Sequence, residues 1–293
     1  MDAGTLNLKE IFSQDRRHVV PLFQRPYVWK KDEQWEPLWD DIRELADRVM
    51  TDGKSRPHFL GAIVLDQQHT TTGQIEMRLV IDGQQRLTTM QLLLEAFCDL
   101  CKELDADKHH RALLKLTRND DPMSDEPDEK FKVWPTQVDQ DTFRSVMNCE
   151  SPADLSTVFE SEDVPSVDSP IANAYSFFYQ VFSEWLQDSE QDTQVKIDAL
   201  LNALREHLRF VVIDLEEDDD AQLIFETLNA RGTPLLPSDL VKNYILHRAD
   251  TENKKVEVLY KKYWKKFDSN ASYWRRTIAV SYTHLTLPTI CSV

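Results

Sequence analysis

Cysteine is scarce in this chain, with four residues among 293. So few cysteines exclude a disulfide-stabilised scaffold. Cys98 and Cys101 have the spacing of half a zinc or redox site, but no second Cys or His pair follows at ligand spacing. Both fall on a helical apolar pattern, so we interpret them as small buried side chains.

Long apolar runs are lacking as well. No stretch approaches the length of a membrane span, and the start, MDAGTLNLKE, has neither the basic nor the apolar part of a signal peptide. The hydrophobic content of 41% and the length are enough for a well-buried core in one large domain or two small ones. We therefore expect a soluble, cytoplasmic protein without a membrane partner.

Positive charge is the third shortage. The net charge of −17 argues against a non-specific grip on DNA over the whole surface. Residues 117–169 hold most of the excess, with 14 acidic and 4 basic residues. By contrast, residues 1–31 carry 6 basic and 3 acidic residues, and residues 254–276 carry 8 and 2. The distribution therefore still allows one positive face.

The first part of the chain predicts strands followed by a long helix. Residues 19–28 should be extended, and a helix capped by Asp32 should follow. Residues 59–66 and 75–82 resemble two strands joined by a polar loop, so we expect a β-hairpin. The second strand leads into a long amphipathic helix that should begin near Arg86.

The rest of the chain is expected to alternate acidic loops with helices. Acidic loops are predicted over 117–130 and 150–169, with a short strand and a helix between them. Further elements are predicted as helices over 170–188 and 193–208, a strand over 209–215, a helix after the aspartates 218–220 and another after 238. The last thirteen residues, SYTHLTLPTICSV, resemble translated sequencing-adapter read-through. We expect the native sequence to diverge near Val280, the alternative being a short natural C-terminal strand.

The segment IDGQQR lies at the predicted junction of the second strand and the long helix. Gly83 permits a tight turn, and the helix start offers unpaired N–H groups to an anion. Arg86 adds a guanidinium fork that matches phosphate oxygens. Asp82 can hold a magnesium ion, and Gln84 or Gln85 can position an attacking water. The chemistry alone fits a capped turn with solvated polar residues equally well.

An earlier polar segment, QRPYVW, combines cationic and aromatic side chains. Gln24 and Arg25 can pair with a phosphate while Tyr27 stacks on a base. An edge strand whose aromatic residues cover the core is the simpler interpretation of this segment taken alone.

A later segment, FETLNARG, is followed by SDLVKN. Asn229 fits a helix C-cap, so structure alone accounts for much of the pattern. Arg231 and Lys242 remain as anion contacts. Lys242 also has the spacing of an ordinary surface pair with Asp239.

Together and in this order, these segments resemble the N-terminal domain of GmrSD-type modification-dependent restriction endonucleases, a ParB/sulfiredoxin-like nucleotide-hydrolysing module. The matching stretches are VPLFQRPYVW, FLGAIVL, LVIDGQQRLTTM, FETLNARGTPL and SDLVKN, and KVWPTQVDQDTF resembles the Pro-then-Asp stretch of such proteins. The resemblance covers roughly residues 5–250. It departs from the pattern at Leu236, where a small hydroxyl residue is expected to start a helix.

The resemblance implies an α+β fold of the ParB/sulfiredoxin-like type, with a small mixed sheet, a long helix after the DGQQR turn and a mainly helical part behind it. We expect a nucleotide-binding core over 1–116 and acidic loops with a helical insertion over 117–208. Residues 209–280 would complete the domain with a strand and helices, and 281–293 would be a non-native tail.

The resemblance also implies a function in defence against phage DNA. The chain would bind and hydrolyse a nucleoside triphosphate (NTP) with Mg²⁺ and control the cleavage of modified DNA by a C-terminal or separate nuclease. The catalytic residues would be Asp82, Gln84, Gln85 and Arg86, with Asp82 as the metal ligand. The nucleotide-binding residues would be Gln24, Arg25, Tyr27, Gly83, Arg86, Asn229, Arg231 and Lys242. A homodimer is compatible with this function.

Two other hypotheses stay open at this point. The chain can be a DNA-recognition module of such a system that does not hydrolyse NTP. A sulfiredoxin-like redox role would need a reactive cysteine near the phosphate site, but Cys98 and Cys101 lie about 18–22 Å along the helix from Arg86. No nuclease set is visible, because His109 and His110 lie in an acidic, surface-like stretch. We therefore expect no DNA cleavage by this chain alone.

Overall fold

The structure, a computed structural model, describes residues 2–22, 24–52, 56–68, 70, 75–120, 126–161, 169–188, 191–216, 219, 224, 242, 245–246, 248–249, 252 and 254–265. The chain forms two compact units. Unit 1 comprises Met1–Val20, Tyr27–Pro135 and Asp139–Ala221, and unit 2 comprises Pro21–Pro26, Thr136–Val138 and Gln222–Val293.

Unit 1 contains a mixed sheet. Its strands are β1 (Asp2–Asn7), β2 (Arg16–Val19), β3 (His58–Gln67), β4 (Glu76–Asp82), β5 (Val133–Trp134) and β6 (Leu208–Leu215). They lie in the order β1-β6-β3-β4-β2-β5. The β1–β6 and β3–β4 pairs are antiparallel, whereas the β6–β3, β4–β2 and β2–β5 pairs are parallel. The predicted hairpin of β3 and β4 is confirmed, as is the α+β class with a mixed sheet.

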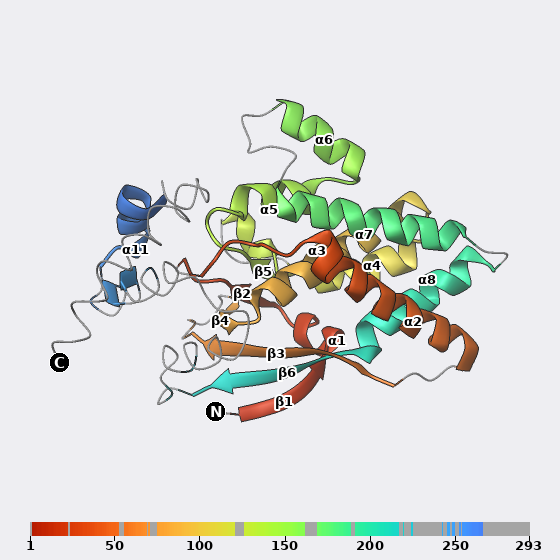
Figure 1. The fold of residues 1–293 in the computed structure, drawn as a ribbon, viewed down its shortest axis with the longest axis horizontal. Coiled ribbons are helices and arrows are strands. Elements are labelled where there is room, and N and C mark those ends of the chain that lie inside the picture. The colour runs from red at the N-terminus through yellow and green to blue at the C-terminus, as the bar shows by residue number, and fades with distance from the viewer. Residues whose placement is uncertain are drawn as a thin grey trace. The chain divides into compact units, whose positions relative to one another are not determined.

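The helices of unit 1 stack on one side of the sheet (Figure 1). They are α1 (Leu8–Phe12), α2 (Glu36–Asp52), α3 (Gln84–Glu103), α4 (Asp107–Thr117), α5 (Gln140–Asn148), α6 (Pro152–Ser161), α7 (Pro170–Gln187) and α8 (Thr193–Asn202). Short π-helical turns, Lys31–Trp35 and Ala203–His207, precede α2 and follow α8, and a 3₁₀ turn spans Pro127–Lys130. Unit 2 contributes α11 (Val256–Leu259) and the π-helical turn Tyr260–Trp264.

Helix α3 is the centre of the hydrophobic core. It packs against α4 and α7, and its residues from Leu87 to Cys101 are all buried. A helix that is enclosed on every side must also bury its polar residues, and Glu95 and Asp99 are 2% and 6% exposed. The aromatic rings of Phe97 and Phe182 pack 5.5 Å apart and join α3 to α7.

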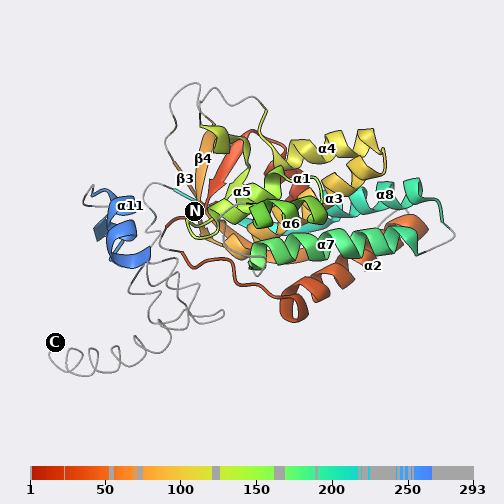
Figure 2. The ribbon, with the colours of Figure 1, turned by 90° about the horizontal axis from the view of Figure 1, so that it is seen from above.

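Helices α2 and α7 run side by side (Figure 2), and the Trp39 and Phe182 rings lie 5.2 Å apart. The helix predicted after residue 32 is confirmed as α2, but its predicted start is not. Lys30, rather than Asp32, is the N-cap, and a π-helical turn precedes α2. Pro37 lies in the first turn of α2, where its missing N–H disrupts the helix least.

Helices occupy part of one predicted loop and both of the predicted helical ranges between residues 150 and 208. The 150–169 loop prediction was wrong in part, since α6 occupies Pro152–Ser161. Leu155 of α6 is buried, with 2% of its surface exposed, and anchors the helix. The otherwise polar composition of this segment had indicated a loop. The helices predicted over 170–188 and 193–208 are confirmed as α7 and α8 with its π-helical turn.

Other predictions lie outside the described residues. These are the helices after 218–220 and after 238, Leu236, and the 281–293 tail. None of the helices in the described part of the chain has both the length and the apolar character needed to cross a bilayer.

Candidate functional site

The IDGQQR segment forms a tight strand-to-helix turn. Strand β4 ends at Asp82 and α3 begins at Gln84, with Gly83 between them as N-cap in the left-handed conformation, φ 89° and ψ 10°. A Cβ atom added at Gly83 would lie 2.5 Å from Cγ2 of Ile63 in β3. Both the backbone conformation and the close packing therefore require glycine here. The turn leaves the N-terminus of a 20-residue helix at the end of the strand.

Arg86 lies over a bulge in β3. Its Nη1 donates a hydrogen bond to the carbonyl oxygen of Ala62 at 2.8 Å. Beneath the guanidinium, Gly61 has φ 99°, and a Cβ atom there would lie 3.2 Å from Arg86 Nε. The other guanidinium nitrogens of Arg86 make no hydrogen bond to a described residue. The Nη1 group of the Arg86 guanidinium is thus held by the backbone of β3, while its other N–H groups can contact an anion.

The QRPYVW segment is hydrogen-bonded to the first turns of α3. The backbone N–H of Val28 donates to Oε1 of Gln85 at 2.9 Å. The Tyr27 hydroxyl and Thr89 Oγ1 lie 2.7 Å apart, and Thr89 Oγ1 donates to the Gln85 carbonyl at 2.7 Å. Because Thr89 uses its proton on Gln85, Tyr27 must be the donor to Thr89. These bonds bring together two of the segments that carry the family resemblance.

The Tyr27 side chain is itself enclosed. Its hydroxyl accepts a hydrogen bond from Nε1 of Trp35 at 2.9 Å, and the residue is 4% exposed. Burial raises the pKa of Tyr27 above its ordinary value, so the phenol stays protonated. The resulting chain of donors runs from Trp35 through Tyr27 and Thr89 to the Gln85 carbonyl. A chain of this kind strengthens each of its bonds.

Asp139 holds the same segment from another side. Its Oδ2 accepts the backbone N–H of Tyr27 at 2.8 Å, and the residue is 7% exposed. Asp139 and Thr89 were not predicted as site residues. The Pro-then-Asp stretch KVWPTQVDQDTF was the available signal for Asp139, whereas Thr89 lay within LVIDGQQRLTTM without any distinguishing feature.

The remaining predicted residues belong to unit 2 or lie outside the described residues. In unit 2, Nζ of Lys242 lies 3.3 Å from the Gln24 carbonyl and 5.5 Å from the centre of the Tyr260 ring. Gln24 and Lys242 are both 3% exposed, and Arg25 is half-buried. Lys242 is therefore buried rather than at the surface, and a pairing with Asp239 stays untested. Asn229, Arg231 and Asp239 lie outside the described residues.

The turn offers Mg²⁺ a single carboxylate. Asp82 is half-buried at the end of β4. Within the described ranges no group of three or more His, Cys, Asp or Glu side chains could enclose a metal ion. Mg²⁺ commonly binds one or two carboxylates together with substrate phosphates and waters. Asp82 beside a helix N-terminus fits that mode and does not fit an all-protein metal cage.

The two cysteines of α3 are buried, as predicted. Cys98 and Cys101 are 1% and 0% exposed. Burial raises the pKa of Cys101 to about 12 and that of Cys98 further still. A buried thiol of high pKa is a poor nucleophile. The described part of α3 therefore gives no support to redox chemistry.

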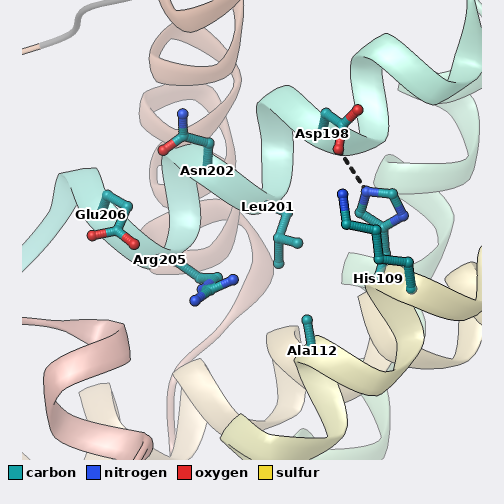
Figure 3. A pocket seen from close by; sticks show the side chains of 8 residues that line it. His109, Ala112, Asp198, Leu201, Asn202, Arg205 and Glu206 are labelled. Atoms are coloured by element: carbon teal, nitrogen blue, oxygen red, sulfur yellow. Dashed lines mark hydrogen bonds and ion pairs between the residues drawn. The ribbon is translucent and has the colours of Figure 1, made fainter.

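The surface-like interpretation of His109 was wrong. His109 is 3% exposed, and its Nε2 lies 2.7 Å from Oδ1 of Asp198 in α8 (Figure 3). The pair lines a pocket of about 230 Å³ between α4 and α8. His109 shares a buried helical face with Leu113 and Leu116, and the charged residues between them concealed that spacing.

The comparison with known protein families gives one match, to the model described as "GmrSD restriction endonuclease, N-terminal domain", over residues 8–246. No curated protein matches the chain. The match spans most of the chain and includes the turn at Gly83, the QRPYVW segment and Asp139. The chain therefore belongs to the family of GmrSD restriction endonuclease N-terminal domains.

Proposed function

We propose that this chain is an NTP-binding and NTP-hydrolysing regulatory domain of a modification-dependent restriction system. It would control a nuclease domain or subunit that acts on modified phage DNA. The observation that supports this most is the turn of Asp82 to Arg86, in which a left-handed glycine places the N-terminus of α3 beside a guanidinium. Such helix starts bind phosphate groups through their unpaired N–H groups and positive dipole.

Each residue of the turn has a distinct part in this proposal. The N–H groups at the start of α3 and the free edge of Arg86 would hold phosphate oxygens. Asp82 would bind Mg²⁺, which neutralises charge on the phosphates when it is present. The Gln85 amide oxygen already accepts from Val28, so Gln85 would position the turn. Gln84, the first residue of α3, would orient the attacking water.

Phosphate release with each of the four ribonucleotides, with and without DNA, tests this proposal. We expect Mg²⁺-dependent release by the wild-type protein and a loss of about 10²-fold in Arg86→Ala, as is typical when a donor to developing negative charge is removed. Arg86 also bonds to Ala62, so thermal unfolding of the variant must be measured alongside. Arg43→Ala, which removes an exposed arginine of α2, is the matched control and should keep full activity. No release by wild type, or undiminished turnover in a folded Arg86→Ala, would contradict hydrolysis at this turn.

The competing function is DNA recognition without hydrolysis. Clusters of basic residues at 1–31 and 254–276 favour it, because Lys and Arg side chains supply contacts to DNA phosphates. Salt-dependent DNA binding that needs no nucleotide and is equal in wild type and Arg86→Ala would support that alternative.

A further inference from the structure

A groove separates the start of the Lys31–Trp35 turn from α7. Its volume is about 460 Å³. It is lined by three aromatic rings, two lysines and several small polar side chains, the most relevant being Trp29, Lys30, Lys31, Asn173, Phe177 and Gln180. Its lining contains no acidic residue, although the whole chain has a net charge of −17. The groove is thus lined by aromatic, basic and neutral polar residues in a chain that is acidic as a whole.

The aromatic walls are firmly supported. The rings of Trp35 and Phe177 lie 5.9 Å apart at 36°. Trp29 and Phe177 are half-buried and pack against the hydrophobic core while part of each ring stays exposed. Supported rings with an accessible face are the usual platform for a nucleobase, because every base can stack on them.

Positive charge lies at the rim of the groove. The side chains of Lys30 and Lys31 are 72% and 57% exposed, and each has an acidic neighbour at 3.5 Å, Glu33 and Glu36 respectively. Exposed pairs of this kind are weak, so an arriving phosphate can replace the carboxylate. Lys31 Nζ also lies 5.7 Å from the centre of the Phe177 ring. A cation is thereby held next to the stacking surface.

The N-terminus of α7 adds to this positive potential. Helix α7 has 18 residues and begins at Pro170, which lines the groove. Its N-cap Ser169 makes no side-chain capping bond, and its first turn contains no acidic residue. The positive end of the helix dipole is thus left without a local counter-charge on its own helix.

We propose that this groove, the Trp29–Phe177 groove, binds a nucleobase that carries a phosphate. The base would stack on the exposed parts of Trp29 and Phe177, and the amides of Asn173 and Gln180 would contact its edge. The phosphate would lie near Lys30, Lys31 and the start of α7. The source of this unit is either a strand of DNA with an unstacked base or a free nucleotide. This site is separate from the turn at Gly83 and does not depend on hydrolysis there.

A hydrogen-bonded path connects the groove to that turn. Trp35 lines the groove and donates through Nε1 to Tyr27, which continues to Thr89 and the Gln85 carbonyl. A ligand that shifts Trp35 therefore acts on a residue bonded to the first turns of α3. Through this path, a ligand bound in the groove can influence the turn at Gly83.

The test is the anisotropy of a fluorescent single-stranded oligonucleotide titrated with full-length protein over a range of salt concentrations. The variant Lys30→Glu/Lys31→Glu reverses two exposed charges and should weaken binding at least about tenfold and lower the salt slope. Arg111→Glu/Lys115→Glu makes the same charge change on exposed residues of α4 and should bind like wild type. Phe177→Leu, which keeps an apolar side chain, should weaken binding about fivefold or more through lost stacking.

Two further measurements distinguish DNA from free nucleotide as the source of the bound base and phosphate. Competition by free NTP that is lost in Lys30→Glu/Lys31→Glu would assign the groove to free nucleotide. Oligonucleotide binding that free NTP does not displace would assign it to DNA. Equal binding of the oligonucleotide, and equal displacement of it by free NTP, in wild type, the groove variants and the α4 control would overturn the proposal. Arg86→Ala should leave groove binding unchanged, which separates this result from a failure of the hydrolysis proposal.

Discussion

The Tyr27 hydroxyl lies 2.7 Å from Thr89 Oγ1, and this bond joins two segments that are 62 residues apart. The same hydroxyl accepts from the buried indole of Trp35 at 2.9 Å. Tyr27→Phe would leave that indole N–H without its acceptor inside the core. We expect a loss of about 1–3 kcal/mol in the free energy of unfolding, measured by urea denaturation. Tyr263→Phe, at a residue that is 55% exposed, is the control and should change stability by less than about 0.5 kcal/mol. Equal stability of the two variants would contradict the chain of bonds through Tyr27.

The left-handed turn before α3 gives a second prediction. In Gly83→Ala the new Cβ would meet Ile63 Cγ2 at 2.5 Å on a backbone with φ 89°. We expect destabilisation of about 2 kcal/mol or more, since strain and steric overlap add. Gly4→Ala has no heavy atom within 4 Å of its added Cβ and serves as the control. A Gly83→Ala protein as stable as Gly4→Ala would show that the turn is not constrained as described.

A buried acidic group on α3 predicts a pH dependence of stability. Burial and, next, the neighbouring Glu95 raise the pKa of Asp99 to about 8. Tyr175 donates a hydrogen bond to its Oδ2 at 2.7 Å, and the nearby Arg118 pairs with Glu95. Between about pH 4 and pH 8 the native state holds a proton on Asp99 that the unfolded state releases. The contribution of Asp99 to stability is therefore full below about pH 4 and falls as the pH rises to 8.

Asp99→Asn removes this titration and keeps the shape of the side chain. The difference in unfolding free energy between wild type and Asp99→Asn should grow in favour of the variant from pH 4 to pH 8. Asp47→Asn, at an exposed position of α2, should give a constant difference over that range. A constant difference for Asp99→Asn as well would refute the raised pKa.

Thiol reactivity separates structural from redox cysteines. Burial raises the pKa values of Cys101 and Cys149 to about 12, and Cys98 is buried beside them with a raised pKa. In a Cys291→Ser protein at pH 7.5, we expect no fast reaction with a thiol reagent until denaturant is added. Rapid labelling of one thiol in the native protein would reopen the redox hypothesis.

Local patterns in the sequence were sufficient for the β3–β4 hairpin, for α3 and for α7. Each has a strong period and clear turn residues, so neighbouring residues alone determine the element. The position of β1 was not predictable in this way, because Asp2–Asn7 pairs with residues 209–214 of β6, about two hundred positions along the chain. Such pairings depend on the whole chain and leave no local signal.

In the candidate site, too, the local features were predictable from the sequence and the long-range contacts were not. Gly83 and the start of α3 were predicted from local chemistry. The contacts of Tyr27 with Thr89 and with Asp139 join residues 62 and 112 positions apart, which periodicity cannot reveal. His109 was misjudged for a related reason, since its partner Asp198 is 89 positions away. The family resemblance supplied the order of the segments, and the fold supplied their contacts.

The central claim, a nucleotide site at the Asp82–Arg86 turn, is tested most directly by the Mg²⁺ dependence of NTP binding. Calorimetric titration of each ribonucleotide, with and without Mg²⁺, should be performed on wild type, Asp82→Asn and Asp47→Asn. We predict that Mg²⁺ tightens binding to wild type and to Asp47→Asn, and that this gain is lost in a folded Asp82→Asn protein. Absence of binding for all four nucleotides, or the same Mg²⁺ dependence in wild type and Asp82→Asn, would contradict the assignment.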